Sequence, residues 1–197
     1  MKSIKLKSYL AGIISLLLFG LLLAQSMEAV CVADYVSWPV SRYLSGHPLG
    51  LSILCGMIAG LSEEAGYYLV FKCFLKERKN WNIPLFFGLG RGVTEAVFYL
   101  MISSVGLSIK ELLYPHICLR LISIGAVIGL SILDYIAVDQ IKWILAISVS
   151  IHAIMNTFSF AAGREIIHVS QRMENGYSMT VSFSAMIITY LIYRKYG

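Results

Sequence analysis

Long apolar stretches separated by short polar segments dominate this chain. An α-helix needs about 20 apolar residues to cross a bilayer core of roughly 30 Å. Six stretches approach that length, at residues 8–25, 48–75, 83–105, 116–138, 141–163 and 177–193. We therefore expect an all-α, polytopic membrane protein, a bundle of about six transmembrane helices that forms a single domain over residues 1–197.

The first stretch has two interpretations. It follows Lys2, Lys5 and Lys7 and is followed by small residues, a pattern that a cleaved signal peptide shares. Its length and the further stretches behind it favour a retained first helix. The mixed segment 26–47, which contains Glu28, is expected to form a loop or an interfacial segment.

The composition supports a membrane protein. Hydrophobic residues make up 58% of the chain and charged residues only 14%, whereas soluble domains carry about a quarter charged residues. The net charge of +5 does not predict a nucleic-acid partner, because no basic run is interleaved with aromatic residues. The expected partner is membrane lipid. The four cysteines form no CxxC pair, so neither a disulfide framework nor a zinc site is predicted.

The positive residues predict the orientation. With the N-terminus cytoplasmic, ten Lys and Arg residues fall on the inner side and five on the outer side, leaving out Arg91 within a span. This distribution obeys the positive-inside rule only for an even number of spans. We expect an integral protein of a bacterial cell membrane with both termini in the cytoplasm.

Several polar residues interrupt the apolar spans. Ionisable residues inside a span cost about 2.5–3.5 kcal/mol each on insertion scales, so they usually face the bundle interior and mark function. In this chain they are Glu63 and Glu64 in the second span, Arg91 and Glu95 in the third, and His152 and Asn156 in the fifth.

These residues are expected to meet at one depth. The second span descends toward the cytoplasm, and the third and fifth ascend from it. At a rise of about 1.5 Å per residue, Glu63, Arg91 and His152 lie within roughly one helical turn of a common level. We therefore predict that three helices bring them to one pocket. An alternative is that Arg91 and Glu95, one turn apart, only neutralise each other.

The chemistry available in such a pocket is hydrolytic. A carboxylate can activate a water while an imidazole orients it or moves its proton. The amide of Asn156 can donate to the oxyanion of a tetrahedral intermediate. A divalent metal ion is possible but not favoured, because it normally takes three protein ligands and one buried histidine is present. No cofactor is therefore predicted.

Other polar and small residues are expected to lie outside this chemistry. Asp134 and Asp139 fall near a cytoplasmic helix end, where they can reach solvent. Three histidines fall at span edges or in loops, namely His47, His116 and His168. Three glycines are interpreted as positions of close helix approach rather than as a phosphate loop, namely Gly88, Gly90 and Gly92.

Three short motifs carry a family resemblance. Glu63 and Glu64 match the paired glutamates of a pattern EExxxR, with Tyr68 at the arginine position. Phe87 matches the aromatic of FxxxH, with Arg91 at the histidine position. The third motif, HxxxN, is matched in full by His152 and Asn156. Over about residues 50–160 the sequence resembles the CAAX-protease and bacteriocin-processing superfamily of intramembrane proteases.

The resemblance is greatest to the YhfC-like branch, whose GHGxxEA motif matches GRGVTEA at 90–96 except at the same histidine. It implies a glutamic-type or metal-dependent peptidase for a membrane-embedded, prenylated or otherwise lipid-linked peptide. The implied catalytic residues are Glu63 as general base, Glu64, His152 at the water and Asn156 at the oxyanion. The implied supporting residues are Tyr68, Arg91 and Glu95.

Arg91 leaves two alternatives open, because its guanidinium cannot exchange protons near neutral pH. One is a catalytically inactive relative that acts as a membrane binding or immunity-type protein. The other is a small proton-linked transporter that uses the Glu and His residues as a relay.

Overall fold

The computed structural model describes residues 2–32, 47–75, 80–103, 115–140, 142–163 and 170–196. Within these ranges, six helical segments are long and apolar enough to cross a membrane, as predicted. The chain is therefore an all-helical integral membrane protein over its described part. Residues 76–79 and 104–114, which lie between or at the ends of the expected spans, are outside the described residues.

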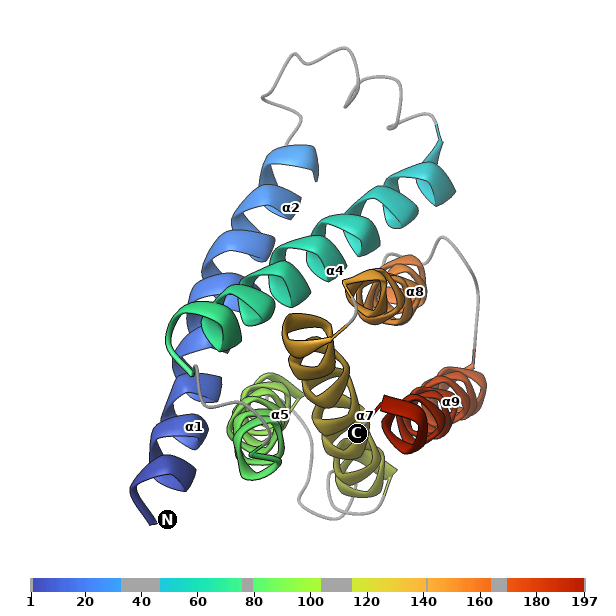
Figure 1. Cartoon of the computed structure of the whole chain (residues 1–197). Coiled ribbons are helices and arrows are strands. Elements are labelled where there is room, and N and C mark those ends of the chain that lie inside the picture. Colours follow the sequence, from blue (N-terminus) through green and yellow to red (C-terminus); the bar gives the residue numbers. More distant parts are fainter. Residues whose placement is uncertain are drawn as a thin grey trace.

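The first span is one helical rod of three parts, and five single helices follow it (Figure 1). The rod contains α1 (Lys2–Ser15), the π-helical stretch η1 (Leu16–Ala24) and α2 (Gln25–Val32). The other helices are α4 (Pro48–Cys73), α5 (Asn82–Ser103), α7 (Pro115–Asp139), α8 (Trp143–Gly163) and α9 (Gln171–Tyr196).

The expectation of a loop from residue 26 is wrong for its first part. Residues 25–32 continue the first helix, so Glu28 is helical. The segment QSMEAVCV contains no glycine or proline that would end the helix. The remainder of the expected loop, residues 33–46, lies outside the described residues.

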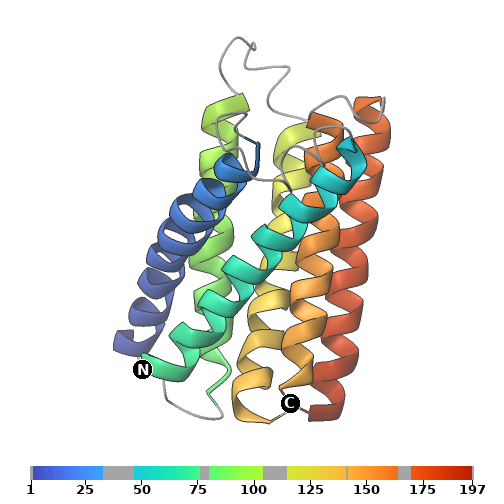
Figure 2. The same ribbon diagram turned by 90° about the horizontal axis from the view of Figure 1, so that it is seen from above.

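The helices form a bundle in which α4 crosses obliquely (Figure 2). α4 packs along α8, α5 packs against both α1 and α7, and α7 packs against α9. The start of α1 and the end of α9 lie at the same end of the bundle, which we call the terminal end. This agrees with an even number of spans, while the cytoplasmic location of that end stays a prediction.

Glycines allow the closest helix contacts, as predicted for Gly88 and Gly90. A Cβ atom at Gly90 would lie 2.1 Å from the Tyr9 carbonyl oxygen of α1, and one at Gly88 would lie 2.7 Å from the Ile128 Cα of α7. α4 approaches α8 in the same way, because a Cβ atom at Gly60 would lie 2.8 Å from the Val149 carbonyl oxygen. Small residues are the usual means by which membrane helices pack closely.

Aromatic residues fill the bundle toward its terminal end. The buried rings of Tyr67, Phe71, Phe87 and Tyr135 contact one another across α4, α5 and α7, with centroids 4.5–5.7 Å apart. Many large apolar side chains of α1, α4 and α9 instead point outward, as expected of helices that face lipid. We call the four buried rings the aromatic layer.

Candidate functional site

Two consecutive glutamates of α4, Glu63 and Glu64, lie in different surroundings. Glu64 lies one turn after Gly60, on the face that packs closely against α8, and its side chain is 0% exposed. Glu63 is rotated away from α8 and keeps 12% of its side chain exposed. A Cβ atom at Gly20 of η1 would lie 3.3 Å from Glu63 Oε2. The first helix therefore leaves room for this carboxylate by having a glycine there.

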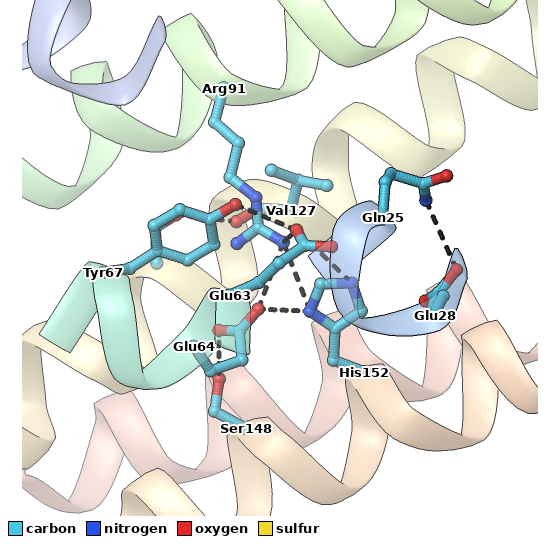
Figure 3. A network of polar contacts seen from close by, with 10 residues as sticks. Gln25, Glu28, Glu63, Glu64, Tyr67, Arg91, Val127, Ser148 and His152 are labelled. Atoms are coloured by element: carbon cyan, nitrogen blue, oxygen red, sulfur yellow. Dashed lines mark hydrogen bonds and ion pairs between the residues drawn. The ribbon is translucent and has the colours of Figure 1, made fainter. Parts of the chain in front are cut away.

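α8 carries a polar stripe opposite the glutamates. Ser148, His152 and Asn156 follow one another at intervals of four residues, which places them on one helix face. Ser148 Oγ donates a hydrogen bond of 2.8 Å to Glu64 Oε2, and His152 Nδ1 lies 2.5 Å from Glu64 Oε1 (Figure 3). Both oxygens of the buried Glu64 carboxylate are therefore held by α8.

Arg91 of α5 reaches both glutamates and the histidine with one nitrogen. Its Nη2 lies 3.1 Å from Glu64 Oε1, 3.4 Å from Glu63 Oε2 and 3.3 Å from His152 Nδ1. The guanidinium is completely buried, and its Cζ lies 4.1 Å from the centre of the Tyr67 ring. An unpaired buried charge is very unfavourable, so this arrangement fixes the guanidinium in place.

His152 is joined to Glu64 through one ring nitrogen. Its Nδ1 lies 2.5 Å from Glu64 Oε1, and the two atoms share a hydrogen bond. This leaves Nε2 as the imidazole nitrogen nearer to Glu63.

Glu63 is the carboxylate on the pocket side of the cluster. Its Oε2 accepts a hydrogen bond of 2.9 Å from the hydroxyl of Tyr67. The same oxygen lies 3.8 Å from His152 Nε2, which is too far for a good direct hydrogen bond. One water molecule can bridge a gap of this size. Glu63 and His152 can therefore act on the same water.

A pocket of about 480 Å³ borders this cluster. Its lining includes the predicted residues Glu63, Arg91, Glu95, His152 and Asn156. It also receives side chains from α2, from the end of α5 and from the starts of α7 and α9. These helix ends all lie opposite the terminal end, so the pocket occupies that half of the bundle (Figure 2).

The aromatic layer closes the site on its other side. Tyr67 and Phe87 lie below Arg91 toward the terminal end, and both are 0% exposed. Neither Phe71 nor Tyr135 lines the pocket. In the described part of the chain, the polar pocket thus ends at a packed layer.

The structure brings the predicted residues together, and their catalytic roles stay predictions. Glu63, Glu64, Arg91 and His152 are in mutual contact, from three helices at the expected depth. Arg91 forms its ion pairs with Glu63 and Glu64, which are on another helix. Mutual neutralisation with Glu95 therefore does not describe its contacts.

Two expectations for individual residues need correction. Tyr68 packs against the apolar core of α7, α8 and α9, with Lys72 over its ring, while the preceding Tyr67 contacts the site. Asp134 was expected to reach solvent near a helix end, but it is fully buried beside Glu64 and Ser148. Its position on the inner face of α7 outweighs its nearness to the helix end.

Of the three histidines expected at span edges or in loops, one has a described side chain. His47 directly precedes α4, while the side chain of His116 and all of His168 lie outside the described residues. The side chain of Asp139 is likewise not described.

Several residues of the site were not predicted from the sequence. Gln25 and Glu28 of α2 line the pocket, and so do Tyr99 and Arg120, whose ring centroid and Cζ lie 4.2 Å apart. The sequence could have indicated Ser148 as a site residue, because it precedes His152 by one helical turn. The sequence did not indicate Glu28 as a site residue, because Glu28 follows the end of the apolar stretch.

The carboxylates and the imidazole are suitable metal ligands by chemistry, but their geometry does not fit a metal ion. Zinc binds nitrogen and oxygen ligands at about 2.0–2.2 Å. The cation that contacts Glu63, Glu64 and His152 is instead the Arg91 Nη2 atom, 3.1–3.4 Å from each of them. Among the described residues, no three His, Cys, Asp or Glu side chains are arranged to hold a metal ion.

Comparison with known proteins identifies the family. A family model described as YhfC intramembrane metalloprotease matches residues 1–114, which include Glu63, Glu64 and Arg91 but not His152. Over 61 residues the chain is 39% identical to "Uncharacterized membrane protein YhfC" of Bacillus subtilis (strain 168). The matched segment covers 31% of this chain and 24% of that protein. No solved structure matches. Because the family model matches more than half of the chain, this protein belongs to the YhfC intramembrane metalloprotease family.

Proposed function

We propose that this protein is an intramembrane peptidase that activates water with Glu63 and acts on a membrane-embedded or lipid-modified peptide. The observation that carries the proposal is the 3.8 Å separation of Glu63 Oε2 and His152 Nε2 on the wall of one pocket. Family membership supports it, since the family is named for intramembrane proteolysis. The motifs also support our placement of the chain in the wider CAAX-protease and bacteriocin-processing superfamily.

The two glutamates have different roles in this proposal. Glu64 is completely buried and held by Ser148, His152 and Arg91, so it positions the imidazole and the guanidinium. Glu63 is partly exposed to the pocket and holds one hydrogen bond from Tyr67. A general base must reach the water that it deprotonates. Glu63 meets this requirement, and Glu64 does not.

The reaction then follows from the groups around the pocket. Glu63 takes a proton from a water held between it and His152 Nε2, and the hydroxide oxygen bonds to the scissile carbonyl carbon. The Asn156 amide donates to the oxygen that becomes negative. The C–N bond breaks as Glu63 returns the proton to the leaving nitrogen. The positive charge of Arg91 offsets the charge of the two carboxylates throughout.

The position of the pocket supports a peptide substrate over transport. A transporter needs a path that can open to both sides of the membrane, whereas this pocket lies in one half of the bundle. The aromatic layer, including Tyr67 and Phe87, separates it from the terminal end. A peptide would therefore enter from the end opposite the termini or from the lipid beside it.

A second function is favoured by the contacts of Arg91. Its guanidinium pairs with both glutamates and lies 3.3 Å from His152 Nδ1. A permanent cation that holds all three groups suits a catalytically inactive relative, which would bind a membrane peptide in the same pocket without cleaving it.

Proteolysis in reconstituted membranes tests both functions. The wild-type protein, Glu63→Gln and His152→Ala are placed in liposomes with a single-span reporter peptide and a farnesylated peptide, and products are measured by mass spectrometry. The peptidase proposal expects cleavage by the wild type and none by Glu63→Gln at equal thermal stability. Cleavage that survives in both variants would refute it. An inactive wild type together with an active Arg91→His variant would support the catalytically inactive relative over the peptidase.

A further inference from the structure

One atom of Arg91 contacts three potential metal ligands. Nη2 is 3.1–3.4 Å from Glu64 Oε1, Glu63 Oε2 and His152 Nδ1 (Figure 3). These three atoms belong to α4 and α8, whereas Arg91 belongs to α5. Carboxylate oxygen and imidazole nitrogen are the donors that zinc takes in catalytic sites. These atoms have the chemistry of metal ligands, yet the cation that they contact is a guanidinium nitrogen.

A metal ion and this guanidinium cannot share the position. A zinc ion bound to these atoms at about 2.0–2.2 Å would lie closer to them than Nη2 does, and beside the buried guanidinium. Displacing the guanidinium would move a fixed charge that is completely buried. The two cations would also repel each other strongly in a medium of low dielectric constant.

Arg91 is held through Nη2 and by the face of an aromatic ring, while Nε and Nη1 have no hydrogen-bond partner among the described residues. The face of the Tyr67 ring covers it at 4.1 Å from Cζ, a contact that favours a flat cation. The same tyrosine donates its hydroxyl hydrogen to Glu63, and Ser148 donates to Glu64. Each carboxylate therefore accepts a hydrogen bond from a protein hydroxyl, with Arg91 as the shared counter-ion.

We propose that the guanidinium of Arg91 takes the place of a divalent metal ion among Glu63, Glu64 and His152, so that this member of a metalloprotease family has a metal-free site. The inference deepens the proposed function by naming the resident cation of the same site. It rests on the geometry of the buried cluster and holds whether or not the pocket cleaves peptides.

Metal content tests the inference without any activity measurement. The purified protein is equilibrated with excess zinc, freed of unbound metal, and its metal-to-protein ratio is measured by inductively coupled plasma mass spectrometry. Cobalt replaces zinc in a parallel sample, because its visible spectrum reports tetrahedral ligation. We expect the wild type to retain no stoichiometric metal. Stoichiometric metal that is lost in His152→Ala would overturn the proposal.

Two variants test whether the guanidinium occupies the metal position. Arg91→His removes it and adds a ligand, while Arg91→Met removes it and leaves the other three donors. We expect at least one folded variant to bind one equivalent of metal and to gain thermal stability with zinc, and to lose both when His152→Ala is added. Two folded variants that bind no metal would refute the claim. Failure of peptide cleavage with these metal results intact would contradict only the proposed function.

Discussion

The Nδ1 atom of His152 lies 2.5 Å from Oε1 of Glu64, although 88 residues separate them in the chain. This contact joins α4 to α8 where both helices are buried. It occupies one side of the imidazole and leaves Nε2 nearer to Glu63 and the pocket. The orientation of the ring is therefore set by a group other than the proposed base.

Arg91 should be essential for stability. In Arg91→Leu, the charges of Glu63 and Glu64 lose their shared counter-ion, so we expect the free energy of unfolding to fall by about 3–5 kcal/mol. Denaturant titration in a fixed detergent measures it. The matched control is Arg120→Leu, which removes an arginine that is only half-buried and should cost much less. Equal losses in the two variants would show that the buried ion pairs are not special.

The hydrogen bond from Ser148 to Glu64 should be measurable. Ser148→Ala leaves Glu64 Oε2 without its donor, and we expect a loss of about 1–3 kcal/mol in the free energy of unfolding. Ser150→Ala is the control, because its hydroxyl is exposed and bonds to the carbonyl of Ala146 in its own helix. That variant should change stability little. If Ser148→Ala left the free energy of unfolding unchanged, this would contradict the hydrogen bond from Ser148 to Glu64.

The close approach of α4 and α8 should depend on Gly60. A methyl group there would lie 2.8 Å from the Val149 carbonyl oxygen, so Gly60→Ala must push the helices apart. We expect a loss of about 1–3 kcal/mol from this overpacking. Gly176 of α9 is the control, since a methyl group there meets nothing within 4 Å. Thermal unfolding should therefore show Gly176→Ala as neutral or stabilised, and the reverse order would refute the packing.

The topology prediction can be tested from outside the cell. In a background without cysteines, Ser170→Cys and Lys142→Cys introduce exposed thiols at opposite ends of the bundle. We expect an impermeant maleimide to label the first in intact cells and the second only after the membrane is opened. Labelling at Lys142→Cys alone would place the termini outside. The pocket would then face the cytoplasm.

The sequence by itself determined the helices and the depth of their polar residues. A bilayer accepts few ways to satisfy the backbone, so long apolar stretches must be spanning helices. The fixed rise per residue then places Glu63, Arg91 and His152 at one level. Neither step depends on which helices are neighbours. The three residues do lie together in the structure.

Only the tertiary structure decided which groups contact one another. Successive helical residues differ by about 100° in direction, so the choice between Tyr67 and Tyr68 depends on how α4 is rotated in the bundle. Glycines bring α4 close to α8 and α5 close to α1 and α7, and in this packing Arg91 pairs with two glutamates of α4. Asp134 is buried for the same reason, since the face of α7 that carries it packs inward. Rotation and neighbour choice result from packing, which no single helix records in its own sequence.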